Sequence, residues 1–375
     1  MGVFEMKIFL GRSFSCSLNY QEGYIFNALA SKHEITKEVS EADIIVFPST
    51  CACTESIMNS IFAYMYDCLE KKKPTAKVYL TGCLTRPFKD KELNKWMEDW
   101  FRENIDFVVP HNTPNLLLQK ISSDFSYLQQ DAFGCCVENS RQNIMQLYIG
   151  NGCLNNCAFC KLSYQFYPLT SMTLEEAKLG IDYAAQRGFS TIEFIATNVS
   201  QVGIDLYGKP ILPELVRYAE AKEGIEKVKI VGFAFKDAIR YKFQNFLAEC
   251  SKVDYVSGAL ETGSPRLLKV TRKGFTPEEM IEFVKDSSGI YKKRWDLNVI
   301  AGLPTETIDD VQETLRVLRK LDPYSVNICE YVNSQMLELS TLPQLSDDEI
   351  SEHARMYEEA LSLMRVKTYL VKKPR

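Results

Sequence analysis

The sequence predicts an α/β fold in two parts: an N-terminal α/β domain built on a parallel sheet, followed by a partial (β/α)6 barrel. Two observations support this prediction. Short apolar runs alternate with helical patterns in both halves of the chain, which is typical of the βα units that build parallel sheets. The length of 375 residues also exceeds the usual size of a single domain, so each part can bury a core of its own.

The N-terminal domain is predicted to span residues 1–125. Its apolar runs have the length of short buried strands. The expected strands are residues 6–10, 43–47, 77–81 and 106–110. Helical periods at residues 21–30 and 55–70 lie between the first three runs. Residues 126–142 are predicted to form a linker, because the sequence there is polar and poorly periodic.

The barrel is predicted to span residues 143–345, where six apolar runs follow one another. The expected strands are residues 147–149, 191–196, 227–231, 255–260, 297–301 and 325–330. Helical periods separate most of them, at residues 173–187, 213–221, 277–285 and 309–321. In barrels of this kind functional groups lie at the carboxyl ends of the strands, so the residues just after each run are candidates. Residues 346–375 are expected to form one amphipathic helix over residues 346–370 and a solvated basic tail with Lys372, Lys373 and Arg375.

The composition is that of an ordinary soluble globular protein, with 46% hydrophobic and 25% charged residues. No apolar run approaches the roughly 18 residues that span a bilayer, and the start of the chain lacks the features of a secretory signal. We therefore expect a cytoplasmic protein without a membrane partner. The net charge of -5 and the pI near 5.5 disfavour a protein whose main role is to bind nucleic acid.

Twelve cysteines in such a chain indicate metal or redox chemistry, because the cytosol keeps thiols reduced. Cys153, Cys157 and Cys160 have C-x-x-x-C-x-x-C spacing directly after the first barrel run. A structural zinc site needs four ligands, and the sequence has no histidine nearby to complete one. A 4Fe-4S cluster held by three thiolates leaves one iron open for a ligand. The spacing favours a cluster, with zinc or buried thiols as the alternative.

A second set of cysteines lies in the N-terminal domain. Cys16, Cys51 and Cys83 each come shortly after an apolar run. The ends of parallel strands share one edge of a sheet, so these residues can converge on a second cluster. Three buried core cysteines are the alternative, and the spacing alone does not decide between them.

The position of the C-x-x-x-C-x-x-C motif resembles the radical S-adenosylmethionine superfamily. The resemblance implies that the open iron binds the amino and carboxylate groups of S-adenosylmethionine. It also implies that electron transfer cleaves this cofactor and releases a 5′-deoxyadenosyl radical, which takes a hydrogen atom from an unactivated carbon. An external electron donor such as flavodoxin or ferredoxin is then expected.

The chain further resembles the radical S-adenosylmethionine methylthiotransferase family, over roughly residues 7 to 345. The likeness rests on the segments around Cys16, Cys51 and Cys83 and on barrel blocks at residues 195–198, 203–209, 263–269, 272–276 and 300–307. It is greatest to the branch that methylthiolates an aspartate of a ribosomal protein. The resemblance implies an auxiliary 4Fe-4S cluster on the three N-terminal cysteines, with Cys53 as the nearest rival to Cys51.

The mechanism implied by the resemblance uses two molecules of S-adenosylmethionine. One methylates a sulfur carried on the auxiliary cluster, and the other gives the radical that activates the substrate carbon. The remaining cysteines receive simpler interpretations. Cys135 and Cys136 are expected to be exposed linker thiols, and three further cysteines to be core residues: Cys68, Cys250 and Cys329.

Superfamily resemblance also places the cofactor. Thr197 and Asn198, after the second barrel strand, are expected at the loop that receives the amino group, and Asn298 with Gly302 near the adenine. Gly302 permits close approach because it has no side chain. Arg272 is a candidate partner of the cofactor carboxylate, and a salt bridge at a helix end is its alternative role.

Glu261 follows the fourth predicted barrel strand. The family has a His-x-Pro-x-Gln run at this place, whereas residues 257–261 of this chain read Ser-Gly-Ala-Leu-Glu. It is a candidate for contact with cofactor or substrate, and a solvated loop carboxylate is the alternative. No other catalytic residue is assigned.

Two more departures from the family pattern concern the substrate. Residues 163–170 are aromatic and lack arginine where the family has a basic stretch, and the small C-terminal β-barrel of tRNA-modifying and ribosome-modifying members is missing. We therefore expect a peptide or protein substrate rather than RNA, contacted by Tyr164, Phe166 and Tyr167. Packing at the domain interface is the alternative role of these rings.

Four other functions stay open at this point. They are methylthio transfer to tRNA or another small substrate, radical sulfur insertion, peptide cross-linking without methyl transfer, and a non-catalytic iron-sulfur sensor or electron-transfer module.

Overall fold

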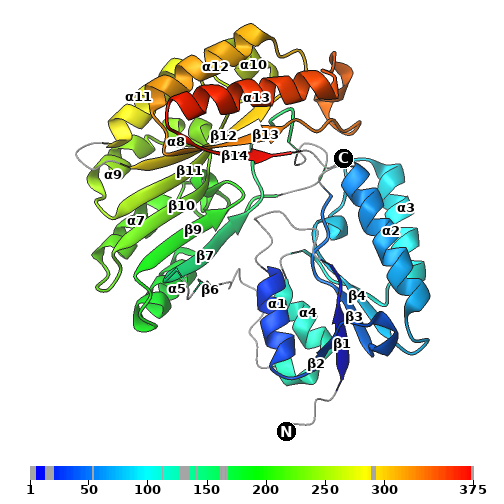
Figure 1. Cartoon of the computed structure of the whole chain (residues 1–375). Helices are drawn as coiled ribbons and strands as arrows, with labels where there is room; N and C mark the ends of the chain where they lie inside the picture. Colours follow the sequence, from blue (N-terminus) through cyan, green and yellow to red (C-terminus); the bar gives the residue numbers. More distant parts are fainter. Residues whose placement is uncertain are drawn as a thin grey trace. The chain divides into compact units, whose positions relative to one another are not determined.

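The computed structural model divides the chain into two compact units (Figure 1), residues 1–137 with 164–167, and residues 138–163 with 168–375. The structure describes residues 6–12, 21–52, 55–111, 113–126, 136–139, 142–160, 162, 165, 168–288 and 293–372. The boundary between the units falls inside the segment 126–142 that the sequence suggests as a linker. A short piece of the second half, residues 164–167, is counted with the first unit.

The first unit is a parallel five-stranded sheet with helices on both faces, which confirms the predicted fold class. The sheet has the order β2-β1-β3-β4-β5 and every neighbouring pair is parallel. The strands are β1 (Lys7–Leu10), β2 (Glu34–Thr36), β3 (Ile44–Phe47), β4 (Lys77–Leu80) and β5 (Phe107–Val108). Only β2 was not expected, because its three residues form no apolar run.

Four helices cover this sheet, with α1 and α4 on one face and α2 and α3 on the other (Figure 1). They are α1 (Gln21–Ala30), α2 (Glu55–Lys71), α3 (Lys91–Asn104) and α4 (Pro114–Ile121). Ile25 and Leu29 of α1 pack with Leu117 of α4 against Ile8 and Val46 of the central strands. Burial of these apolar side chains holds the sheet edge that carries Cys51 and Cys83.

The second unit is a nine-stranded sheet in the order β14-β13-β12-β11-β10-β9-β7-β6, with β8 paired to β7. Strands β7 and β9 to β14 are parallel to one another. The strands are β6 (Cys136–Asn139), β7 (Ile144–Asn151), β8 (Thr170–Ser171), β9 (Thr191–Ala196), β10 (Lys227–Phe233), β11 (Val253–Glu261), β12 (Arg294–Ala301), β13 (Ser325–Glu330) and β14 (Lys367–Val371). All six predicted barrel strands are present.

The C-terminal segment differs from the expectation of a helix and a solvated tail. The helix is present as α13, but residues 367–371 form β14, a seventh parallel strand that pairs with β13. The predicted helix extends to residue 370 and therefore includes four of these five residues, whereas α13 ends at Leu363. Pairing with β13 decides the conformation here, and no local sequence signal reports that pairing.

The helices of the second unit lie along the outer side of the curved sheet (Figure 1). They are α5 (Leu174–Gln186), α6 (Ile204–Tyr207), α7 (Leu212–Ala221), α8 (Phe235–Arg240), α9 (Phe243–Glu249), α10 (Pro265–Val270), α11 (Pro277–Ser288), α12 (Ile308–Leu321) and α13 (Asp347–Leu363). Capping boxes fix the starts of α5, α12 and α13. An aromatic core of Phe233, Phe235, Phe283 and Trp295 joins α8 and α11 to β10 and β12.

Among the described residues, no helix combines the length and the apolar character that crossing a membrane requires.

Candidate iron-sulfur and cofactor site

The three cysteines of the C-x-x-x-C-x-x-C motif lie on one loop at the carboxyl end of β7, and each is partly exposed. We call residues 152–160 the thiol loop. Gly152 starts it with φ +83, and a Cβ there would stand 2.0 Å from the carbonyl oxygen of Pro168. Only glycine fits this turn. Farther along, the backbone N–H of Ala158 donates to the carbonyl of Thr271 at 3.1 Å, which ties the loop to the end of α10.

Polar hydrogens are aimed at the sulfur of Cys153. The side-chain amide of Asn198 donates to Cys153 Sγ at 3.3 Å, and the backbone N–H of Asn155 lies 3.4 Å from the same atom. Such donors stabilise a negatively charged sulfur, as in a thiolate bound to iron. The residues present therefore fit an iron-sulfur cluster.

Burial raises the pKa of the Cys153 thiol, while the hydrogen bond from Asn198 opposes that rise. Burial also raises the pKa of Cys157, and the positive charges of Lys273 and Lys236 oppose it. Among the described residues, no three histidine, cysteine or acidic side chains converge on one point that a single ion could fill. An iron-sulfur cluster does not require the three sulfurs to meet at one point, because each thiolate binds a different iron atom.

Thr197 and Asn198 lie where the sequence places them, directly after β9. The hydroxyl of Thr197 donates to Asn151 Oδ1 at 2.7 Å, and Asn151 also accepts the backbone N–H of Gly152 at 2.9 Å. The amide of Asn198 is shared between Cys153 Sγ and the carboxylate of Asp237, the latter at 2.9 Å. Both residues thus brace the thiol loop.

Glu261 is not a solvated loop carboxylate. It ends β11 at φ +66, is 8% exposed, and pairs with the ammonium of Lys273 at 3.5 Å. Burial raises the pKa of Glu261, and the charge of Lys273 opposes that rise. Lys273 also lies 5.7 Å above the ring of Phe159 in the thiol loop. The pair therefore places one negative and one positive charge beside Cys157.

Sequence reasoning assigned no role to Lys273. Its neighbour Arg272, the predicted partner of a cofactor carboxylate, instead pairs with Glu338 and is partly exposed. The structure thus gives Arg272 the alternative role, a salt bridge near the end of α10. Lys273 stands beside Arg272 in the block at residues 272–276 that resembles the family, but only the fold shows which of the two cations is buried.

Asn298 lies on β12, and its side-chain Oδ1 accepts a hydrogen bond from the side-chain amide of Asn327 at 3.0 Å. Gly302 follows the strand with φ +79, and a Cβ there would stand 2.4 Å from Ile350 of α13. Among the described residues, the close approach of helix α13 therefore explains why position 302 is a glycine. The backbone N–H of Gly302 donates to the Glu306 carboxylate at 2.6 Å.

In the first unit, the loops after β3 and β4 bring Cys51 and Cys83 to one place. The backbone N–H of Cys83 donates to the carbonyl of Thr50 at 2.7 Å, and both cysteines are buried. Gly82, at φ +104, permits this contact, since a Cβ there would stand 2.4 Å from the Thr50 nitrogen. Gln165, a buried residue that the sequence did not single out, donates to the carbonyl of Cys83 at 3.2 Å.

Several predicted positions lie outside the described residues: Cys16, Cys53, Cys135, Tyr164, Phe166 and Tyr167. Cys136 lies in β6, and its side chain is not among those described. Cys68 and Cys250 are buried, as expected for core residues, and burial raises the pKa of Cys250 to about 12. Cys329 is only half-buried, on β13.

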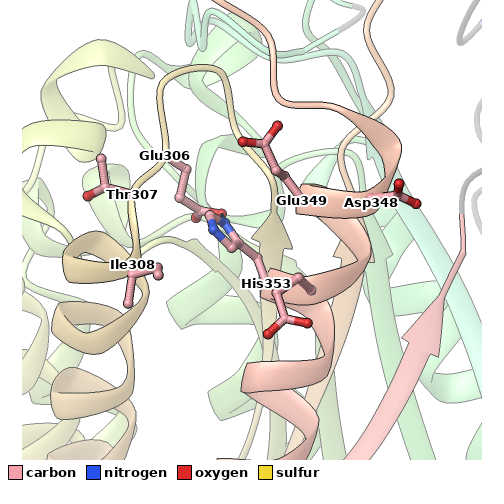
Figure 2. Close-up of a pocket in the computed structure, with 7 residues that line it drawn as sticks. Glu306, Thr307, Ile308, Asp348, Glu349 and His353 are labelled. Atoms are coloured by element: carbon pink, nitrogen blue, oxygen red, sulfur yellow. Dashed lines mark hydrogen bonds and ion pairs between the residues drawn. The ribbon is translucent and has the colours of Figure 1, made fainter.

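A separate cavity of about 530 Å³ lies between the starts of α12 and α13 (Figure 2). Its lining is mostly acidic and comprises Glu306, Thr307, Ile308, Asp348, Glu349, Glu352 and His353. His353 faces Glu306, and its Nδ1 lies 2.8 Å from the carboxylate. Glu349 closes the capping box of α13, so part of this acidity serves the helix start.

Comparison with known proteins agrees with this geometry. The model of the Radical SAM superfamily matches residues 147–318, which include the thiol loop, and that of Uncharacterized protein family UPF0004 matches residues 8–101. A solved radical S-adenosylmethionine methyltransferase, TsrM from Kitasatospora setae, has the same fold with a TM-score of 0.56 and 12% identity, over 90% of this chain and 77% of that one. The fold and the thiol loop define a radical S-adenosylmethionine enzyme.

Its curated relatives are methylthiotransferases. A tRNA-2-methylthio-N(6)-dimethylallyladenosine synthase of Clostridium botulinum is 25% identical, over 84% of this chain and 72% of its own length. A ribosomal protein uS12 methylthiotransferase RimO of Sulfurovum sp. is 22% identical, over 92% of this chain and 79% of its own length. The chain belongs to the radical S-adenosylmethionine methylthiotransferase family, as the resemblance indicated. Membership implies S-adenosylmethionine and a 4Fe-4S cluster as cofactors.

Proposed function

We propose that this enzyme attaches a methylthio group to an unactivated carbon of a peptide or protein side chain, with Cys153, Cys157 and Cys160 as ligands of the radical cluster. The contact between Asn198 and Cys153 Sγ carries the proposal, because it aims a donor at a sulfur of the motif. The 4Fe-4S cluster, together with S-adenosylmethionine, supplies the radical chemistry when both are bound. An external donor such as flavodoxin or ferredoxin supplies the electron.

The residues around the thiol loop bind and orient the cofactor in this proposal. Thr197 and Asn198 brace the loop at the end of β9, where the amino group is received. Lys273 is the buried cation beside Cys157, so a cofactor carboxylate meets Lys273 more readily than Arg272, which is paired with Glu338. Glu261 keeps Lys273 neutralised before the cofactor arrives. Asn298 and Gly302 border the adenine.

The auxiliary cluster is proposed on Cys16, Cys51 and Cys83. The hydrogen bond from Cys83 to Thr50 supports this assignment, because it holds two of the three cysteine loops together. The buried Gln165 adds a further restraint on Cys83. This cluster carries the sulfur that is transferred, which is the feature that separates methylthio transfer from methyl transfer or simple hydrogen abstraction.

The products test the proposed reaction. Reduced, anaerobically reconstituted protein should convert S-adenosylmethionine into both 5′-deoxyadenosine and S-adenosylhomocysteine, because radical formation and methyl transfer each consume one molecule. Liquid chromatography with mass spectrometry measures both. An iron-sulfur sensor makes neither product, and a sulfur-inserting or cross-linking enzyme makes only deoxyadenosine. Deoxyadenosine alone, with an authentic substrate present, would exclude methylthio transfer.

The net charge of -5 supports a peptide or protein over RNA, because binding to a phosphate backbone relies on lysine and arginine. A tRNA substrate is the second candidate, since relatives named as tRNA-modifying enzymes match this chain as well as the uS12 enzymes do.

We expect weak tRNA binding at physiological salt, because the net negative charge of the chain opposes the approach of a phosphate backbone. Fluorescence anisotropy with bulk tRNA, and with peptides taken from ribosomal protein uS12, measures both affinities across a salt series. Tight tRNA binding that falls steeply as salt rises would overturn the protein assignment and favour the second candidate.

A further inference from the structure

We propose that Asp237 is a positioning residue for the radical cluster, which fixes the amides around Cys153 and holds a negative charge beside the cluster. The inference rests on the proposed function, since it takes Cys153 as a cluster ligand. Asp237 lies on α8, after β10, and is 4% exposed. Asp237 lies outside every sequence motif described above.

Asp237 gathers three amide groups from two other strand ends. Its Oδ2 accepts the side-chain N–H of Asn155 at 2.6 Å and that of Asn198 at 2.9 Å. Its Oδ1 accepts the side-chain N–H of Gln201 at 3.0 Å. Asn155 belongs to the thiol loop after β7, whereas Asn198 and Gln201 follow β9. One buried carboxylate thus joins the ends of β7, β9 and β10.

These amides in turn hold the thiol loop. Asn198 donates to Cys153 Sγ at 3.3 Å, and Gln201 Oε1 accepts the backbone N–H of Leu154 at 2.7 Å. A side-chain amide presents hydrogens at one end and an oxygen at the other. Because Asn198 must donate to Asp237, its hydrogens rather than its oxygen face the sulfur. The carboxylate of Asp237 therefore ensures that Asn198 presents a hydrogen-bond donor to Cys153 Sγ.

The arrangement also fixes a charge. Both oxygens of Asp237 accept amide hydrogens, and its hydrogen-bond partners in the described part of the chain are neutral. Inside the protein the charge of a carboxylate is poorly screened by solvent. A fixed negative charge opposes the addition of an electron to a nearby cluster. We therefore infer that Asp237 makes the radical cluster harder to reduce.

Two variants separate this role from packing. Asp237→Asn keeps the size of the side chain and removes the charge, and Asp237→Glu keeps the charge. Redox titration followed by electron paramagnetic resonance gives the midpoint potential of each cluster. The signal that changes when S-adenosylmethionine is added belongs to the radical cluster. D237N should titrate at a more positive potential than wild type, whereas D237E should stay near wild type and retain its iron. Asp182→Asn is the matched control, since it removes one acidic charge from α5, outside this network.

A wild-type potential in D237N, or a shift to more negative values, would overturn the inference. Equal loss of iron from D237N and D237E would also overturn it, because it would reduce Asp237 to a packing residue. Iron lost from D237N but retained by D237E would support a requirement for the charge. Wild-type protein without any signal sensitive to S-adenosylmethionine would instead refute the proposed function, so the two failures are distinguishable.

Discussion

Replacing Cys153, Cys157 and Cys160 together by alanine is expected to abolish formation of 5′-deoxyadenosine and to leave about half of the iron. The reconstituted wild-type protein should hold about eight iron atoms, as two 4Fe-4S clusters on three thiolates each. The three cysteines share one loop of the second unit, so their removal leaves the N-terminal set intact. An iron assay and chromatography of the nucleoside products measure both outcomes.

The matched control replaces Cys51 and Cys83 by alanine. This variant should lose the other half of the iron and the S-adenosylhomocysteine that methyl transfer produces, yet still form deoxyadenosine. Loss of all iron from either variant, or zinc in place of iron, would contradict two independent clusters. A loss of both products from both variants would show instead that the clusters depend on one another.

Replacing His353 by alanine should destabilise the second unit by about 3–5 kcal/mol, because it leaves a buried carboxylate without its partner. The Glu306 side chain is fully buried, and its carboxylate lies 2.8 Å from His353 Nδ1. Chemical denaturation of the variant and wild type measures the difference. Glu306→Gln combined with His353→Ala removes the stranded charge and should cost less. A double variant as unstable as H353A would contradict this explanation.

The same pair predicts how this stabilisation depends on pH. The hydrogen bond to Glu306 raises the pKa of His353, and burial raises the pKa of Glu306. A histidine whose pKa is raised by folding stabilises the protein fully below its unfolded value of about 6.5 and loses that contribution as the pH rises through the folded value. The difference in stability between wild type and H353A should therefore shrink as the pH rises through this range.

Local patterns predicted most of the architecture because buried parallel strands form apolar runs with clear ends. The same logic missed the short strands β2, β6, β8 and β14, of which β6 lies inside the predicted linker. Strands β2, β6 and β14 lie at the edges of their sheets. At such edges pairing with one neighbour decides the structure. The sequence holds no local trace of that neighbour, since the partner of β14 lies more than a helix away along the chain.

The candidate site divides in a similar way. Spacing predicted the cysteines of the thiol loop, the family resemblance predicted Asn198, and a departure from the family pattern drew attention to Glu261. Asp237 and Lys273 were missed because their roles come from contacts between residues far apart in sequence. Asn155 and Asp237, for example, are 82 positions apart. The sequence also could not tell that Gly302 is packed against Ile350, since the need for a missing side chain depends on what approaches it.

Strand β14 has a protective consequence for the sheet. The backbone groups on the outer side of β13 would otherwise form an open template beside Val326 and Ile328, which is the kind of surface that recruits other chains into aggregates. The five residues of β14 cover that template. The strand that takes its place starts with Lys367, followed by Lys372 just beyond its end, and lysines at an exposed edge discourage further pairing. Strand β14 thus shields the edge of β13 from pairing with other chains.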